Sequence, residues 1–173
     1  QELKYRGHQV TVITTWPEYN LEQDTNSHSF SEKEDENGIT VLRVKSLPHH
    51  NINYLVRGIA QLLMPLQFLW KLWKYGIRVE KCITYSPPLP LAFVGIGLRF
   101  FGVKALLNLQ DLFPQNAVDL GVLKNPLQIA IFRIIESVSY KFSNIITVHS
   151  DGNRSMLLDQ YPSIKKKIHI LHN

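Results

Sequence analysis

The sequence predicts an α/β protein built on a doubly wound, Rossmann-like parallel sheet. Short β-branched, apolar runs alternate with longer helix-like runs along the whole chain, and this alternation is typical of βαβ crossovers. Gly and Pro stand at the ends of several runs, where turns are expected. The length of 173 residues and the hydrophobic fraction of 45% suit one domain, 1–173, with a buried core.

The first half of the chain begins with the end of a helix. Residues 1–6 are expected to form it and Gly7 to close it, because Gly adopts the left-handed conformation at a helix C-terminus without steric cost. Residues 16–38 are polar, and the acidic run 32–36 is predicted to lie in a solvated loop. The other expected elements are a strand over 9–14, a strand over 39–44, and a helix over 53–75 that Pro65 kinks.

The second half repeats the strand–helix unit. Apolar residues recur at helical spacing in 127–142, which indicates a helix with one face in the core. The expected elements, in order, are a strand over 80–86, a helix over 91–102, a strand over 103–109, a loop or short helix over 110–126, a helix over 127–142, a strand over 144–150, a helix over 151–161 with Asp151 as its N-cap, and a strand over 167–173.

The loops that follow the predicted strands are the place to look for a site. Open α/β sheets bind ligands outside the carboxyl ends of their strands, which here are the loops 15–17, 86–90, 110–116 and 150–153. Asp111 stands just beyond one strand. Its carboxylate could accept a hydrogen bond from a sugar hydroxyl or help to remove a proton. The alternative is that Asp111 caps the helix that follows.

Two further turns carry candidate residues. Ser86 and Pro87 open the run Ser-Pro-Pro-Leu-Pro, which forms either a preformed wall of a cleft or only a rigid turn into a helix. Ser150 and Gly152 lie where a strand meets a helix N-terminus, and backbone N–H groups at such a terminus favour a phosphate. Because the turn holds a single Gly, an ordinary capped helix start is the alternative.

Several function classes have no support in the sequence. It contains no G-x-G-x-x-G run, no Walker A run and no pair of carboxylates spaced for glycoside hydrolysis. His49 and His50 lack a carboxylate at ligand spacing, so no metal site is expected. Cys82 lies in an apolar run without a neighbouring base, which favours a buried structural thiol. The net charge of +5 is dispersed, and nucleic acid is therefore not expected as a partner.

Residues 55–75 are the most apolar stretch of the chain. Arg57, Pro65 and Lys71 interrupt it, so its uninterrupted apolar run is too short to span a bilayer. The helix is either a buried crossover or a membrane-facing segment. The second alternative rests on its C-terminal end, which mixes aromatic rings with ammonium groups as the lipid headgroup region favours, in Trp70, Lys71, Trp73 and Lys74.

Five segments of the chain share one resemblance. They read, in order, RGHQVTVITTWPEYN, YSPPLPLAFVGIG, LQDLFPQNAVDLGVL, IESVSYKFSNIITVHSDG and KIHILHN. Together they resemble the N-terminal lobe of the family-four GT-B glycosyltransferases. Within that family they are similar to the WbuB-like branch, which resembles an L-fucosamine transferase of O-antigen assembly. The resemblance covers nearly the whole chain.

The resemblance implies the acceptor-side half of a retaining glycosyltransferase that needs no metal or other cofactor. The implied reaction moves a sugar, such as an N-acetyl amino sugar, from a nucleotide-sugar to a polyprenyl-diphosphate-linked saccharide. It would take place on the cytoplasmic face of the membrane, in bacterial cell-surface polysaccharide synthesis. By position, Asp111 would line the catalytic cleft with Ser86, Pro87 and Trp16 beside it, and Ser150 and Gly152 would lie near the donor phosphates. Glu136 matches a helix Glu of the family with a structural role.

The resemblance also leads to expectations about what lies outside this chain. The family's first strand, and its C-terminal donor lobe with an E-x7-E motif, have no counterpart in the sequence, so the chain alone is expected to be inactive. Two alternatives stay open: a freestanding lobe that associates with a separately encoded donor lobe, and a peripheral membrane module without catalysis. His149 stands where the family leads us to expect a small apolar or polar residue.

Overall fold

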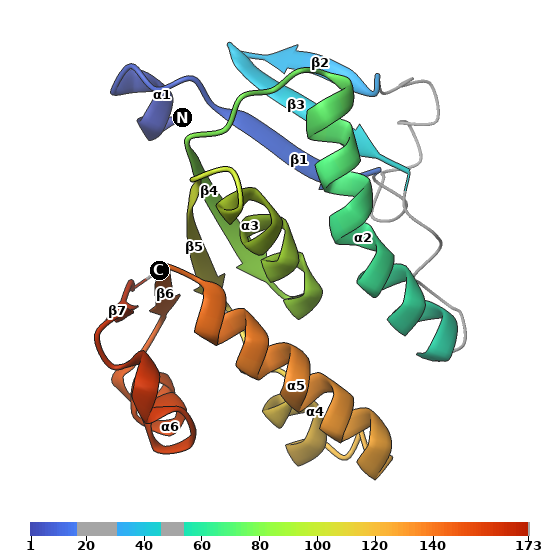
Figure 1. Ribbon diagram of the computed structural model, residues 1–173, viewed down its shortest axis with the longest axis vertical. Helices are drawn as coiled ribbons and strands as arrows, with labels where there is room; N and C mark the ends of the chain where they lie inside the picture. Colours follow the sequence, from blue (N-terminus) through green and yellow to red (C-terminus); the bar gives the residue numbers. More distant parts are fainter. Residues whose placement is uncertain (17–30, 46–53, 173) are drawn as a thin grey trace, which may run out of the picture.

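The computed structural model describes residues 1–16, 31–45 and 54–172 and confirms the α/β, Rossmann-like prediction (Figure 1). The strands of these residues form two sheets. The first has the order β1 (Thr11–Thr15), β3 (Ile39–Val44), β2 (Lys33–Glu36), and the second has the order β4 (Lys81–Ser86), β5 (Lys104–Leu109), β6 (Ile145–Val148), β7 (Ile168–Ile170). The second sheet is parallel throughout, and β1 runs parallel to β3.

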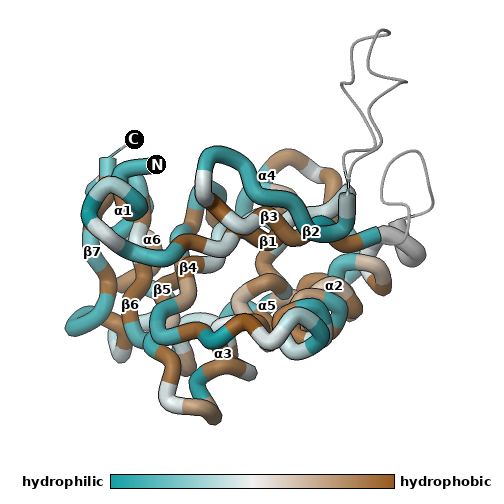
Figure 2. The backbone as a smooth tube through the Cα atoms, turned by 90° about the horizontal axis from the view of Figure 1, so that it is seen from above, coloured by the Kyte–Doolittle hydropathy of each residue, from teal (hydrophilic) through white to brown (hydrophobic). Residues whose placement is uncertain are grey.

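The helices connect these strands in the expected order. They are α1 (Glu2–Tyr5), α2 (Tyr54–Lys74), α3 (Ala92–Arg99), α4 (Gln115–Asp119), α5 (Pro126–Phe142) and α6 (Asp151–Gln160), with short 3-10 turns η2 (Leu89–Leu91) and η3 (Pro162–Ile164). Figures 1 and 2 show α2, α3 and α5 together on one side of the strands. We call these three helices the helical layer.

The main core lies between the second sheet and this layer. Alternate residues of a strand point to the same face of the sheet, and Leu107, Leu109, Ile146 and Val148 are each 0% exposed. They pack in one cluster with Tyr140 of α5 and with apolar residues of α6 and η3. Burial of these apolar faces supplies the main driving force for this part of the fold.

A smaller apolar cluster joins the two sheets. Ile13 of β1, Val44 of β3 and Cys82 of β4 pack in the same cluster as Met64 and Phe68 of α2. Each sheet therefore contributes strand residues to a core that α2 covers. This shared cover fixes the two sheets side by side on one helical layer.

The prediction of a solvated loop over the acidic run 32–36 was wrong for the residues that form β2. Lys33–Glu36 is an exposed strand, antiparallel to β3, with Glu34 opposite Val41. Arg43 of β3 supplies the countercharge, because its guanidinium pairs with Glu34 at 2.5 Å and also with Glu36. The rest of the predicted loop, 17–30, lies outside the described residues, as do His49 and His50.

Pro65 lies inside helix α2, which is continuous through it. One helix end differs in detail from its prediction. Helix α6 begins at Asp151, but its N-cap is Ser150, whose hydroxyl oxygen accepts a hydrogen bond from the backbone N–H of Asn153. Ser150 takes this role because its extended backbone lets the short side chain reach the free N–H groups of the first turn. Gly7 has the left-handed φ of +83° predicted for it.

Candidate functional site

Strand order brings the predicted site loops together. β4, β5 and β6 are consecutive in the second sheet, so the segments that follow them, 86–90, 110–114 and 149–152, are neighbours along its carboxyl edge. The backbone N–H of Gln110 donates to the carbonyl of Ser86 at 2.8 Å and ties the first two segments together. The third segment enters α6 through the Ser150 cap.

Asp111 has an exposed side chain in the middle segment. It does not cap a helix, because α4 begins at Gln115 and its N-cap is Pro114. Within the part of the chain that the structure describes, its carboxylate has no hydrogen-bond or ion-pair partner. A solvent-facing carboxylate at the carboxyl edge of a parallel sheet remains available to a bound ligand.

Ser86 lies below the protein surface, whereas Pro87 lies on it. Ser86 is 1% exposed and its hydroxyl has no partner among the described residues, whereas Pro87 is exposed. The peptide bonds Ser86–Pro87, Pro87–Pro88 and Phe113–Pro114 are cis. Of these two predicted site residues, Pro87 is the one whose side chain is exposed to solvent at this edge of the sheet.

Trp16 belongs to the first sheet. It follows β1, and its backbone N–H donates to the carbonyl of Val44 at 2.9 Å. The ammonium of Lys45 lies 5.3 Å from the centre of its ring, within the range of a cation–π contact. The indole is half-buried, so one part of it remains open to solvent beside the end of β1.

His149 is a candidate that sequence reasoning left without an interpretation. Its Nδ1 lies 2.8 Å from the carbonyl oxygen of Leu171. A carbonyl only accepts, so Nδ1 carries the proton and, in the neutral ring, Nε2 keeps its lone pair. Nε2 is buried and has no partner in the described parts of the chain. The sequence offered no signal for this role beyond the position of His149 directly before Ser150, at the end of a predicted strand.

Glu136 is 1% exposed and has a structural environment. Its carboxylate accepts hydrogen bonds from Arg133 at 2.9 Å, Tyr140 at 3.2 Å and Tyr161 at 2.9 Å. Burial, with the hydrogen bond to the Glu136 carboxylate, raises the pKa of Tyr161 to about 12. The network joins α5 to the segment between α6 and η3, and Arg133 also donates to the side chain of Gln115, at the start of α4 directly after the middle site segment.

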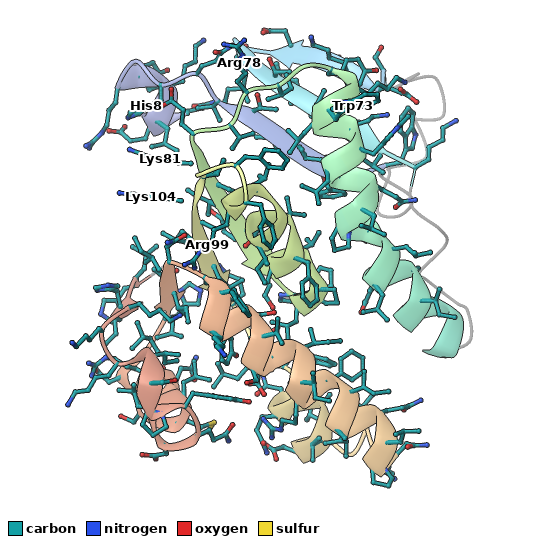
Figure 3. The ribbon with its side chains drawn as sticks, viewed as in Figure 1. His8, Trp73, Arg78, Lys81, Arg99 and Lys104 are labelled. Atoms are coloured by element: carbon teal, nitrogen blue, oxygen red, sulfur yellow. The ribbon has the colours of Figure 1, made fainter. Side chains whose placement is uncertain are left out.

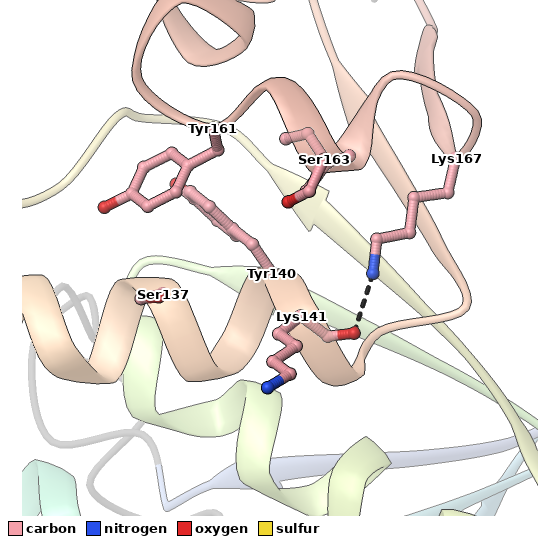
Figure 4. A pocket seen from close by; sticks show the side chains of 7 residues that line it. Ser137, Tyr140, Lys141, Tyr161, Ser163 and Lys167 are labelled. Carbon is pink, nitrogen blue, oxygen red and sulfur yellow. Dashed lines mark hydrogen bonds between the residues drawn. The ribbon is translucent and has the colours of Figure 1, made fainter.

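A pocket of about 370 Å³ adjoins this network (Figure 4). Lys167 donates from its ammonium to the carbonyls of Lys141 at 2.8 Å and Ser143 at 3.0 Å, so it caps the end of α5. Burial, together with the charge of Arg99, lowers the pKa of Lys167. None of the predicted site residues lines this pocket, whose walls are Ser137, Tyr140, Lys141, Tyr161, Ser163, Ile164 and Lys167.

The residues predicted to face a membrane divide into two groups. Trp70 and Trp73 are 54% and 79% exposed. Lys71 is buried instead, and its ammonium pairs with Glu32 at 2.9 Å; the prediction that it faces a membrane was wrong. Lys74 is half-exposed and shares Glu32 with Lys71. Among the described helices, none is long and apolar enough to cross a bilayer.

Comparison with known proteins leaves the site to be judged by its own geometry. The chain matches no protein-family model, and no curated protein is significantly similar to it.

The described residues contain no group of three or more His, Cys, Asp or Glu side chains that could hold a metal ion. Burial raises the pKa of the Cys82 thiol to about 11, which makes it a poor nucleophile.

Proposed function

We propose that this chain is the acceptor-side domain of a retaining glycosyltransferase that works at a membrane surface. It moves a sugar, such as an N-acetyl amino sugar, from a nucleotide-sugar to a polyprenyl-diphosphate-linked saccharide. The observation that carries the proposal is the exposed carboxylate of Asp111, which has no partner among the described residues and stands between two neighbouring loops at the carboxyl edge of the parallel sheet. The sequence resemblance supplies the reaction class.

Each loop has a distinct part in this proposal. Asp111 accepts a hydrogen bond from a sugar hydroxyl. Pro87 and the open part of the Trp16 ring border the saccharide. Ser150 holds the first turn of α6, and Gly152 leaves its backbone N–H groups accessible to a diphosphate.

The proposed partners follow from the same reasoning. The nucleotide-sugar is a co-substrate and no metal is required. A donor-binding domain completes the enzyme, either in the same polypeptide or encoded separately. The membrane surface supplies the lipid-linked acceptor, and the proposed location is the cytoplasmic face of the cell membrane.

The acceptor half of the proposal is tested by binding. The chain is mixed with nanodiscs that carry a polyprenyl-diphosphate-linked N-acetylhexosamine, and retention is compared with nanodiscs that carry the same lipid without the sugar. Asp111→Asn removes the charged acceptor and is expected to weaken sugar-dependent retention on the order of ten-fold, since a hydrogen bond to a charged group contributes about 1.5–3 kcal/mol. Asp159→Asn, on exposed α6, is the matched control. Equal retention with and without the sugar would disprove acceptor recognition.

A non-catalytic membrane module is the second candidate, and the exposure of Trp70 and Trp73 favours it. Both functions predict that Trp70→Ser with Trp73→Ser weakens co-sedimentation with vesicles of phosphatidylcholine and phosphatidylglycerol. Tyr5→Ser, at an aromatic that is 81% exposed on α1, is the control. Vesicle binding without any preference for the sugar-bearing lipid selects the membrane module. Unchanged vesicle binding of the Trp variant removes α2 as the contact.

A further inference from the structure

Helix α2 is apolar on two opposite sides. Its inner side packs in the core through Ala60, Met64 and Phe68. Its outer side carries six exposed large apolar residues at spacings of three and four, which place them on one stripe of a helix. They are Ile59, Leu62, Leu63, Leu66, Trp70 and Trp73.

Helix α5 repeats this arrangement on the other flank of α3. Ile135, Ser139 and Tyr140 are buried on its inner side. Leu127, Ile131 and Ile134 are exposed on its outer side, again at spacings of four and three. Helices α2 and α5 both contact α3 in the helical layer (Figures 1 and 2). Each has a buried side in the core, so each carries its exposed stripe on its solvent side.

Two exposed aromatic rings lie at the end of α3, the helix that contacts both α2 and α5. Phe100 and Phe101 follow α3 directly and are 87% and 84% exposed. The apolar area of these two adjacent rings is exposed to water. A partner that covers the rings would gain the free energy of burying that area. We call this set, from the α2 stripe through Phe100 and Phe101 to the α5 stripe, the outer apolar surface.

The charges of the helical layer have one sign. Helices α2 and α3 contain no Asp or Glu, and the only acidic residue of α5 is Glu136, which is buried. Lys74, Arg99 and Lys141 lie at the C-terminal ends of the three helices. Figure 3 shows Trp73 at the end of α2 and Arg99 near the amino ends of the second sheet. Glu32, which precedes β2, pairs with Lys74 at the end of α2. The three helices themselves combine exposed apolar side chains with cations and contribute no exposed carboxylate.

We infer that the whole outer apolar surface, and not α2 alone, is the face that binds an anionic lipid bilayer. This inference rests on the membrane part of the proposed function and extends it to α5 and to Phe100 and Phe101. Apolar side chains enter the boundary between headgroups and acyl chains, while lysines and arginines attract anionic headgroups. The absence of exposed carboxylates from the three helices removes the repulsion that such a surface would otherwise meet.

A second copy of the chain fits this face less well. A two-fold interface places the same patch on both subunits. Here it would bring cations against cations with no acidic side chain of the three helices to pair with them, and such like-charge contacts are unfavourable. An anionic bilayer can bury the exposed apolar side chains and neutralise the cations beside them.

Vesicle co-sedimentation with matched variants tests the inference. One variant is Ile131→Ser with Ile134→Ser on α5, and another is Phe100→Ser with Phe101→Ser. Each is expected to weaken binding to phosphatidylcholine–phosphatidylglycerol vesicles by at least about ten-fold, because each removes two inserted apolar side chains. The control is Ile83→Ser with Tyr85→Ser, at residues of similar exposure on β4 that point away from the helices. Circular dichroism confirms that each variant is folded.

A label at one position gives a readout that is independent of affinity. An environment-sensitive dye is attached to Ile134→Cys in a Cys82→Ala background, with Ser155→Cys at an exposed position of α6 as its control. The dye at 134 is expected to shift to the blue on addition of vesicles, and the dye at 155 is not. Blue-shifted emission at 134 without vesicles, together with a dimer in sedimentation velocity, would overturn the lipid assignment.

The outcomes separate this inference from the proposal beneath it. If the Trp70 and Trp73 variant loses vesicle binding while the α5 and Phe variants bind like the wild type, the extended surface is wrong and the α2 contact stands. If the unaltered chain does not bind vesicles, the membrane part of both is wrong. Sugar-dependent retention on nanodiscs then still decides acceptor recognition on its own.

Discussion

The two sheets are stabilised by different kinds of interaction. The second sheet rests on strands with fully buried apolar residues and on the buried carboxylate of Glu136 behind them. The first sheet ends in β2, whose residues are all exposed. Arg43 pairs with carboxylates of β2 within the sheet, and Lys71 and Lys74 of α2 pair with Glu32, the residue directly before β2.

This difference shows how an acidic run becomes a strand. Lys33–Glu36 buries no side chain, so the hydrophobic effect does not explain its conformation. Its backbone pairs with β3, and its carboxylates lie on the face where Arg43 meets them. The countercharges come from residues distant in sequence. The first sheet should therefore respond to charge and pH, and the second to changes in its interior.

The largest effect is expected at Glu136. Glu136→Ala leaves the hydroxyl of Tyr140 buried without its acceptor and removes the partner of Arg133. Loss of one partner from a buried ionic network costs about 3–5 kcal/mol, and urea unfolding monitored by circular dichroism measures it. Tyr161→Phe removes a single hydrogen bond of the network and should cost about 1 kcal/mol. If the two variants lose the same stability, Glu136 is not the centre of the network.

Much of the second sheet could be predicted from the sequence. β4 to β7 lie within two residues of their predicted bounds or inside them, because each strand is a β-branched, apolar run bounded by turns. β2 was missed because four charged residues in a row carry no apolar periodicity. The sequence signal for it was the Asn37-Gly38 turn into β3, where both residues have positive φ. Its pairing with Arg43 has no apolar pattern to reveal it.

The candidate site was predictable in position but not in side-chain orientation. Strand order alone places Asp111, Pro87 and Ser150 along one edge. It does not show that the Ser86 hydroxyl points inward, because a residue at a strand end can fall on either face. Similarly, the burial of Lys71 depends on Glu32, which is 39 positions earlier in the printed sequence. The acceptor nitrogen of His149 depends on the carbonyl of Leu171 in another segment.

An intermediate effect is expected at Arg43. Arg43→Met keeps an apolar stem but removes the guanidinium that pairs with Glu34 and Glu36. Because the carboxylates are half-exposed while the guanidinium is buried, the loss should lie between that of surface and buried pairs, about 1–2 kcal/mol. Hydrogen exchange of the β2 amides should quicken more than that of β5 or β6.

Arg6→Met supplies the comparison for this prediction. Arg6 pairs with Glu2 on α1, where both side chains are exposed, and its removal should change the free energy of unfolding by less than about 1 kcal/mol. If the Arg43 and Arg6 variants were equally stable, the ion pairs of β2 would have no special weight in holding the first sheet together.

The smallest effect is expected at Glu32, and it depends on pH. Hydrogen bonds from Lys71, Lys74 and Tyr75 lower the pKa of Glu32 from its ordinary value of 4.5 to about 2. A carboxyl group with a depressed pKa in the folded state stabilises that state above its unfolded pKa and loses this contribution as pH falls through the folded value. The contribution of Glu32 should therefore be complete above about pH 4.5 and disappear towards pH 2.

Glu32→Gln tests this window directly. At neutral pH the variant should have a slightly lower Tm than the wild type, because its amide cannot pair with the two ammonium groups. As the pH is lowered from 4.5 towards 2, the two Tm curves should converge, since protonated Glu32 in the wild type is then also neutral. Glu80→Gln, at an exposed carboxylate just before β4, serves as the control and should follow the wild type throughout. A constant Tm difference between wild type and Glu32→Gln across this range would show that the carboxylate acts through its shape and not its charge. An interaction other than this ion pair would then have to hold β2 against α2.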